Sequence, residues 1–451
     1  MKQNDLISKY DVPGPRYTSY PTVPYWSITG WEQDEWFKTV NKGLELSPGK
    51  EISLYIHLPY CDSLCTFCGC HKYITTNHQV ESPYIDALLW EWKTTLQHLK
   101  YKPVVAALHL GGGTPTFFSS ESLSKLINGL KELVDFTSDA EMGFEGHPNS
   151  TTEEHLQTLY NFGFKRVSFG IQDYDPIVQT TIHRVQSFET VQNVHNLSRK
   201  IGYTSVSHDL VYGLPMQTWD GFNKTIEKTL SLQPDRISLY SYAHVPWIKG
   251  TGQRGYSEED LPSGLTKRTI YENAKEALIN GGYIEIGMDH FALPHDELAI
   301  AFQEKRLFRN FMGYTIQPTK ILLGIGVSSI SDSWFGFMQN KSNVKEYLET
   351  IVQGELPITR GHLLSEIDLE VRQHILNIMC YFETEINEDS HLSFSDLIRD
   401  LYPLIVDGLV EVKDTKISVT PEGLPFIRNC CMAFDQYLKN PISAKTFSRT
   451  I

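Results

Sequence analysis

Between about residue 50 and residue 245 the sequence alternates short β-branched or aromatic runs with longer segments of helical periodicity. This alternation is typical of βα units around a parallel sheet, because each helix carries the chain back to the start of the next strand. Six such strands can curve into a partial barrel, and the loops that follow them gather at one rim. The predicted strands are Ile52–His57, Val104–Leu110, Glu141–Glu145, Arg166–Gln172, Ser205–Tyr212 and Arg236–Tyr242.

The length of 451 residues exceeds what one simple core needs, so we expect several units in an α/β chain. We predict an N-terminal arm or lid over residues 1–45, the partial barrel over 46–245 and a barrel extension with substrate-site elements over 246–355. A mainly helical domain is expected over 356–451. Its two helices, followed by a short hairpin near residues 408–419, resemble a winged helix.

The formal net charge of -14 argues against a general nucleic-acid binder, which would need a basic face. We find neither the apolar core of a secretory signal nor a run of about 20 apolar residues that would span a bilayer. We therefore expect a reducing, cytoplasmic location without membrane contact. We also expect a monomer.

Four cysteines follow the first predicted strand, with the spacing C-x3-C-x2-C-x-C at Cys61, Cys65, Cys68 and Cys70. Closely spaced thiolates favour an iron–sulfur cluster or zinc. A structural zinc site usually has a second cysteine pair downstream, which this sequence lacks. Three cysteines would instead bind three irons of a four-iron cluster and leave the fourth iron open. Cys380, Cys430 and Cys431 are interpreted as buried hydrophobic residues.

Glycines and polar residues follow the next strands. The run Gly111–Thr116 comes after the second strand, and glycines there let the backbone approach a ligand closely. Glu145, Gln172 and Asp209 stand at the ends of later strands, and Arg184 follows the fourth. Carboxylates at such a rim suit ribose hydroxyls or an ammonium group, and arginine suits a carboxylate. Each residue taken alone fits a structural cap or an ion pair equally well. Their common position at one rim of the sheet is what favours a binding site.

These motifs resemble those of radical S-adenosylmethionine (SAM) enzymes. More narrowly, the chain is similar to the oxygen-independent coproporphyrinogen III oxidases over nearly its whole length. This closer resemblance is carried by Cys70 and by the segments Gly14–Thr22, Tyr242–His244, Gly287–Ala292 and Phe447–Arg449.

The resemblance implies a role for individual residues. Cys61, Cys65 and Cys68 would ligate a 4Fe-4S cluster whose open iron is chelated by SAM, and Tyr55 and Cys70 would serve catalysis. The propionates of the implied substrate need cationic partners, and Arg16 is the first candidate for this catalytic role. Arg306 and Arg309 come behind it, and each of these two fits a solvated surface arginine as well. Ile330 would contact a second SAM. Met312 stands where the family usually has Gln, so the amide hydrogen bonds that would hold a second SAM are missing. The implied cofactor-binding set is Tyr55, Phe67, Cys70, Gly112, Gly113, Thr114, Glu145, Gln172, Arg184, Asp209, Ala243 and Ile330.

The implied activity is the oxygen-independent oxidative decarboxylation of coproporphyrinogen III in haem biosynthesis. A 5'-deoxyadenosyl radical derived from SAM would take a hydrogen from the β-carbon of two propionates in turn, and each would become a vinyl group, giving protoporphyrinogen IX. The implied partners are this substrate and a low-potential electron donor such as flavodoxin or ferredoxin.

Two other functions are compatible with parts of the sequence. A haem chaperone or haem-degrading enzyme of the same superfamily would share the cysteine loop, but Cys70 and the N-terminal arm disfavour it. A zinc-binding interaction protein that uses the winged-helix-like tail as an adaptor would contain zinc without iron or sulfide.

Overall fold

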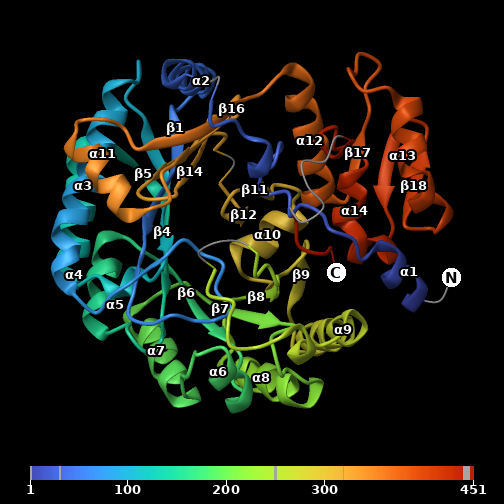
Figure 1. Ribbon diagram of the computed structural model, residues 1–451, viewed down its shortest axis with the longest axis horizontal. Helices are drawn as coiled ribbons and strands as arrows, with labels where there is room; N and C mark the ends of the chain where they lie inside the picture. The colour runs from blue at the N-terminus through green and yellow to red at the C-terminus, as the bar shows by residue number, and fades with distance from the viewer. Residues whose placement is uncertain (1–2, 30–31, 248–250, 318, 440–446, 451) are drawn as a thin grey trace.

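The computed structural model describes residues 3–29, 32–247, 251–317, 319–439 and 447–450. Figure 1 shows a curved sheet with helices around it, and a smaller unit of helices and short strands, drawn in orange and red, beside it. The first helix, α1 (Gln3–Tyr10), lies next to this smaller unit. In the part of the chain that is described, no helix is long and apolar enough to cross a membrane.

Six parallel strands form the centre of the main sheet, which confirms the predicted partial barrel. Both faces of β1 are covered, since Ile52, Ser53 and Leu54 are all buried. The third strand begins earlier than predicted, at Asp135. In spatial order the six strands are β1 (Glu51–Leu58), β4 (Val104–Gly112), β5 (Asp135–Gly146), β6 (Arg166–Gln172), β7 (Ser205–Tyr212) and β8 (Arg236–Ser241).

Helices connect these strands, and their ends are set by local capping residues. Ser119 and Thr152 each accept a hydrogen bond from an amide in the first turn of the helix that follows. Gly163 and Gly202 end two helices with φ of 108° and 115°, a left-handed conformation that glycine adopts without strain. The helices are α3 (Glu81–Gln97), α4 (Ser120–Leu133), α5 (Glu153–Phe162), α6 (Pro176–Thr181), α7 (Phe188–Ile201) and α8 (Trp219–Leu232).

Further strands widen the sheet at both edges to twelve strands among the described residues. On one side β13 (Leu322–Ile325) pairs parallel with β1 and is followed by antiparallel β14 (Ile330–Asp332), β15 (Gly336–Asn340) and β16 (Ile358–Leu363). On the other side β10 (His290–Ala292) and β9 (Ile284–Ile286) add to β8. Since β16 lies beyond residue 355, the main sheet reaches past the predicted end of the extension.

Short elements complete the main body. Its remaining helices and strands are α2 (Gln33–Leu46), β2 (Tyr60–Cys61), β3 (Tyr73–Ile74), α9 (Gly264–Asn280), α10 (Glu297–Gln303), β11 (Phe308–Asn310), β12 (Gly313–Thr315) and α11 (Val344–Val352). Trp36 and Val40 of α2 are buried in the core of the main sheet, so the segment predicted as an arm also contains a helix of the main body.

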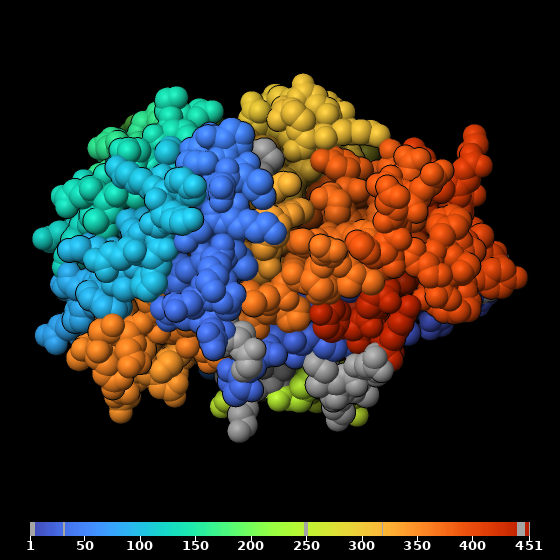
Figure 2. Space-filling view, turned by 90° about the horizontal axis from the view of Figure 1, so that it is seen from above, coloured from blue at the N-terminus to red at the C-terminus, as the bar shows by residue number. Residues whose placement is uncertain are grey.

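The C-terminal unit has the order expected of a winged-helix-like domain. Its elements are α12 (Glu366–Tyr381), β17 (Glu383–Glu385), α13 (Phe394–Val406), β18 (Val410–Lys413), β19 (Lys416–Val419) and α14 (Ile427–Met432). Its core also takes in Tyr10, Tyr17 and Tyr20 from the N-terminal segment. Figure 2 shows blue N-terminal residues running along the boundary between the barrel and this unit.

Candidate active site

The cysteine loop follows β1 and faces a cavity of about 480 Å³, the cofactor cavity. Cys61, Cys65 and Cys68 line it as free thiols. The Sγ atom of Cys61 lies 3.4 Å from the Thr114 hydroxyl, and that of Cys65 lies 3.7 Å from Nη1 of Arg184.

The donor set fits a cluster better than a single ion. Among the described residues, no group of three or more His, Cys, Asp or Glu side chains converges closely enough to hold one metal ion. Thiolates that each bind a different iron of a cluster do not need to converge on one point. The three neighbouring thiols at this open cavity therefore fit as the residues that would hold a 4Fe-4S cluster.

Most of the predicted site residues meet at this cavity, although they come from five strands and their loops. Besides the three cysteines, the cofactor cavity is lined by Phe67, Cys70, Gly112, Gly113, Thr114, Glu145, Gln172, Arg184 and Asp209. The parallel topology brings the ends of β4, β5, β6 and β7 to one rim, as the sequence predicted.

The glycine loop is shaped by contacts within the protein. A Cβ atom on Gly113 would lie 2.5 Å from the Pro59 carbonyl oxygen, and one on Gly112 would lie 2.8 Å from the His57 ring. The amide of Gly113 donates to Leu58 O at 2.8 Å. The glycines therefore let the loop pack closely on the end of β1, and the loop forms one wall of the cavity.

The polar strand ends differ in their electrostatic environments. Burial pushes the pKa of Glu145 upward, but hydrogen bonds from His109 and the Gly112 amide outweigh it, so its pKa lies below the ordinary value. Burial raises the pKa of Asp209, which accepts a hydrogen bond from Ser168 at 2.6 Å. Gln172 ends β6 with φ of 68°, a left-handed conformation that is uncommon for this residue type and is frequent at functional sites.

A second cavity of about 490 Å³, the inner cavity, adjoins the cofactor cavity. The two share Cys70, Gly112 and Glu145 as lining residues. Tyr55 and Ile330 face the inner cavity only, so the predicted cofactor-binding set is divided between two adjoining spaces. Met312 also lines the inner cavity and is 37% exposed.

Two histidines that line the inner cavity, His57 and His109, were missed by the sequence analysis. Burial lowers the pKa of His57 to about 4, so the ring is neutral near pH 7. Because the His71 carbonyl, 2.9 Å from Nε2, only accepts, the proton lies on Nε2 and Nδ1 accepts from the Tyr55 hydroxyl at 3.3 Å. His109 stacks on Tyr55. A signal for His57 was present in the sequence, because Tyr55 and His57 are two residues apart on β1 and their side chains therefore lie on the same face.

The backbone carbonyls of Ala243 and Phe67 are bridged by the side chain of Gln253. Gln253 donates to the Ala243 carbonyl at 2.8 Å and to the Phe67 carbonyl at 3.4 Å. Ala243 itself is not among the residues that line the cofactor cavity or the inner cavity. This bridge ties the end of β8 to the cysteine loop.

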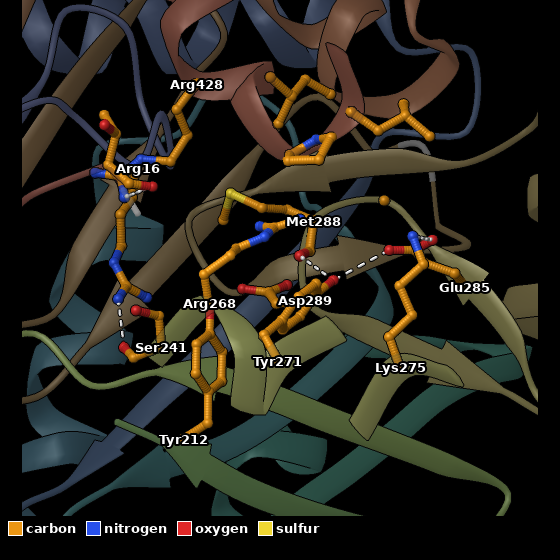
Figure 3. A pocket seen from close by; sticks show the side chains of 15 residues that line it. Arg16, Tyr212, Ser241, Arg268, Tyr271, Lys275, Glu285, Met288, Asp289 and Arg428 are labelled. Atoms are coloured by element: carbon orange, nitrogen blue, oxygen red, sulfur yellow. Dashed lines mark hydrogen bonds and ion pairs between the residues drawn. The ribbon is translucent and has the colours of Figure 1, made fainter. Parts of the chain in front are cut away.

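Arg16 is not brought to either cavity. It lines a separate small cavity near the ends of β7 and β8, where its Nη2 donates to the Ser241 carbonyl at 2.7 Å (Figure 3). Of the two arginines predicted behind it, Arg309 is buried and donates to the Tyr17 carbonyl at 2.9 Å. Arg306 is an exposed arginine that pairs with Glu304.

Comparisons with known proteins agree with this arrangement. The Radical SAM superfamily model matches residues 55–229. The curated oxygen-independent coproporphyrinogen III oxidase of Pseudomonas aeruginosa is 38% identical over 458 residues, covering 99% of this chain and 98% of the relative. The enzyme of the same name from Escherichia coli is 39% identical over 453 residues, with the same coverage. The solved structure of the Escherichia coli coproporphyrinogen III oxidase, described as a radical SAM enzyme, gives a TM-score of 0.88 at 38% identity and covers 94% of this chain and 97% of that one.

Proposed function

This chain belongs to the oxygen-independent coproporphyrinogen III oxidases of the radical SAM superfamily, and from this membership we propose that it turns two propionates of coproporphyrinogen III into vinyl groups. It is a radical SAM oxidoreductase of porphyrin biosynthesis, with a 4Fe-4S cluster and SAM as cofactors. The observation that carries the proposal is the open cavity at which the three cysteines, the glycine loop and the polar strand ends meet.

We assign the cluster to Cys61, Cys65 and Cys68, which face the cofactor cavity. When bound, the cluster and SAM supply the 5'-deoxyadenosyl radical that removes a hydrogen from the propionate β-carbon. Arg184 contributes positive charge beside Cys65 and still has N–H groups with which to bind the SAM carboxylate.

The remaining polar residues hold and orient SAM in this proposal. Glu145 and Asp209 accept hydrogen bonds from the ammonium or ribose groups, and Gln172 borders the same space. The low pKa of Glu145 keeps it ionised at neutral pH, which suits a positively charged group. Phe67 lines the same cavity, while the carbonyl of Ala243 is held in place by Gln253.

We place the reacting part of the substrate at the junction of the two cavities. Cys70 is exposed there and borders both spaces, and the Tyr55 hydroxyl is oriented by its hydrogen bond to neutral His57. These side chains would hold the propionate near SAM and keep water away from it. Ile330 and Met312 line the inner cavity, where a second SAM would bind.

The proposal extends to partners and location. An electron donor of low potential, such as flavodoxin or ferredoxin, would reduce the cluster. A cytoplasmic location is part of the proposal, because metal-binding thiolates must stay reduced. A monomeric state is also part of it.

Anaerobic turnover tests the function. The protein is reconstituted with iron and sulfide and incubated with SAM, a reductant and coproporphyrinogen III. We expect mass spectrometry to find a product that has lost two carboxyl groups, together with 5'-deoxyadenosine. Deoxyadenosine without a decarboxylated porphyrinogen would contradict the assignment of coproporphyrinogen III as the substrate. Zinc in place of iron and sulfide would support the zinc-binding alternative.

A further inference from the structure

The segment between β8 and α9 packs against the cysteine loop. Within it, residues 251–257, which we call the strap, make the contacts. The amide of Gly252 donates to the Cys68 carbonyl at 3.3 Å, and a Cβ atom on Gly252 would lie 2.6 Å from the Cys65 carbonyl oxygen. Because glycine has no Cβ atom, the strap backbone can lie directly on the backbone that carries the cysteines.

The strap also holds the middle of the cysteine loop through Tyr256. The Tyr256 hydroxyl donates to the Thr66 carbonyl at 2.9 Å, so its oxygen accepts from the Tyr242 hydroxyl 2.5 Å away. Thr66 itself donates from its amide to the Ile182 carbonyl at 2.9 Å and from its hydroxyl to the Thr181 carbonyl at 3.1 Å. The middle of the loop is therefore held by the strap and by the end of α6.

Gln253 is the strap residue with the most connections. Its side chain is buried, and Nε2 donates to the Ala243 carbonyl at 2.8 Å and to the Phe67 carbonyl at 3.4 Å. Its Oε1 atom accepts from the Val245 amide at 2.6 Å. Turning the amide over would bring its oxygen against two carbonyls, so its orientation is fixed. One planar group thus sets the separation between the cysteine loop and the end of β8.

The effect of Gln253 on the cofactor cavity passes through its partner Phe67. Phe67 lines that cavity, whereas Gln253 is not among the lining residues. Phe67 and Tyr240, which also lines the cavity, pack on an apolar cluster that contains Val211. Hydrogen bonds in such apolar surroundings are stronger than in water, and losing one of them costs more. A change at Gln253 therefore moves a wall of the cavity without removing any group that lines it.

We propose that Gln253 is a positioning residue for SAM. It holds Phe67 at a fixed distance from Ala243, so that the wall of the cofactor cavity matches the bound cofactor, and it touches neither SAM nor the cluster. The inference rests on the proposed function, since SAM and the cluster belong to it. The cysteines are untouched by this role, so binding of SAM and retention of the cluster can be separated.

Gln253→Glu in the reconstituted holoenzyme tests the proposal. The variant keeps the length of the side chain and an acceptor for the Val245 amide, but it replaces the donor to Phe67 and Ala243 by an oxygen. We expect the dissociation constant for SAM, measured by anaerobic calorimetry without reductant, to rise about three- to tenfold, as the loss of one or two neutral hydrogen bonds requires. The KM for SAM should rise with it. Iron, sulfide and the KM for coproporphyrinogen III should stay at the values of the parent protein.

Two further variants separate positioning from a general need for the strap. Gln253→Met removes both hydrogen-bonding ends without burying a charge, and it decides the question if the buried carboxylate of Gln253→Glu prevents folding. Tyr256→Phe removes the hydroxyl that binds the Thr66 carbonyl and leaves Gln253 in place. We expect Gln253→Met to weaken SAM binding as Gln253→Glu does, and Tyr256→Phe to bind SAM nearly as the parent protein does.

Gln157→Glu is the matched control, because Gln157 is an exposed glutamine whose Nε2 donates to Asn161 on its own helix at 2.9 Å. It should leave SAM binding and turnover unchanged. The proposal is overturned if both Gln253 variants bind SAM as tightly as the parent protein, if they lose iron together with SAM affinity, or if Tyr256→Phe weakens SAM binding equally. A parent protein that binds no SAM after reconstitution would mean instead that the proposed function fails.

Discussion

Nη1 of Arg184 lies 3.7 Å from the Sγ atom of Cys65, which joins the loop after β6 to the cysteine loop after β1. The same guanidinium is fixed by donation from its Nη2 to the Gly170 carbonyl at 2.7 Å. One side chain therefore lies between the proposed cluster and the space where SAM would bind. Its charge can act on both.

Replacing Arg184 separates these two roles. Arg184→Gln removes the charge and the fork that would bind the SAM carboxylate, so the dissociation constant for SAM should rise about tenfold or more. Iron content should stay near that of the parent protein, because the three cysteines remain. Calorimetry on the reconstituted protein measures the first quantity, and iron and sulfide analysis the second. Arg184→Lys should give intermediate affinity, and unchanged SAM binding in both variants would contradict the assignment.

The fourth cysteine should behave differently from the other three. Cys68→Ser is expected to lose most of its iron and sulfide after anaerobic reconstitution, since a hydroxyl is a poor replacement for a thiolate ligand. Cys70→Ser should keep the cluster and lose porphyrinogen turnover, because Cys70 borders both cavities. Metal analysis of the two variants side by side is the measurement. Equal loss of iron in both variants would show that Cys70 is also a ligand of the cluster.

The sequence predicted the six central strands and the meeting of residues as distant as Cys61 and Asp209 at one rim. Local periodicity and the rule that parallel strands end at the same edge are sufficient for that. It also predicted the two helices and hairpin of the C-terminal unit.

Long-range contacts could not be predicted in this way. Arg428 donates to the carbonyl of Pro15, 413 positions away in the chain, and nothing near either residue indicates the contact. Arg16 was predicted to hold substrate propionates, and it lies in a separate cavity rather than in the cofactor cavity or the inner cavity. His57 was missed although it shares a face of β1 with Tyr55, because a histidine within an apolar strand is by itself more often a core residue than a cavity residue.

Glu91 predicts a dependence of stability on pH. Burial raises its pKa to about 7, although it accepts hydrogen bonds from Tyr347 at 2.5 Å and Asn340 at 2.6 Å. Because the pKa of the folded state lies above that of an unfolded chain, near 4.5, the contribution of Glu91 is fully present below pH 4.5 and is lost as the pH rises through 7. The loss amounts to about 3 kcal/mol at most.

Denaturant unfolding at pH 5, 6, 7 and 8 measures this dependence. The free energy of unfolding of the parent protein minus that of Glu91→Gln should fall over this range, because the glutamine has no proton to lose. The difference between the two proteins, rather than either value alone, isolates Glu91 from the other titrating groups. A difference that stays constant, or that rises with pH, would contradict a raised pKa at this position.

Met312 decides how many SAM molecules we expect the protein to hold. It lines the inner cavity together with Asn310 and Gln339, which are buried and have side-chain atoms without a hydrogen-bond partner among the described residues. A thioether is at best a weak acceptor and donates no hydrogen bond, so it cannot replace the amide that the family usually has there. We expect the parent protein to bind one SAM per chain in equilibrium dialysis, and Met312→Gln to bind a second. Met312→Leu is the control, because it keeps the cavity apolar and should leave the stoichiometry at one. Two SAM molecules bound by the parent protein would show that groups such as Asn310 and Gln339 are enough to hold the second without an amide at position 312.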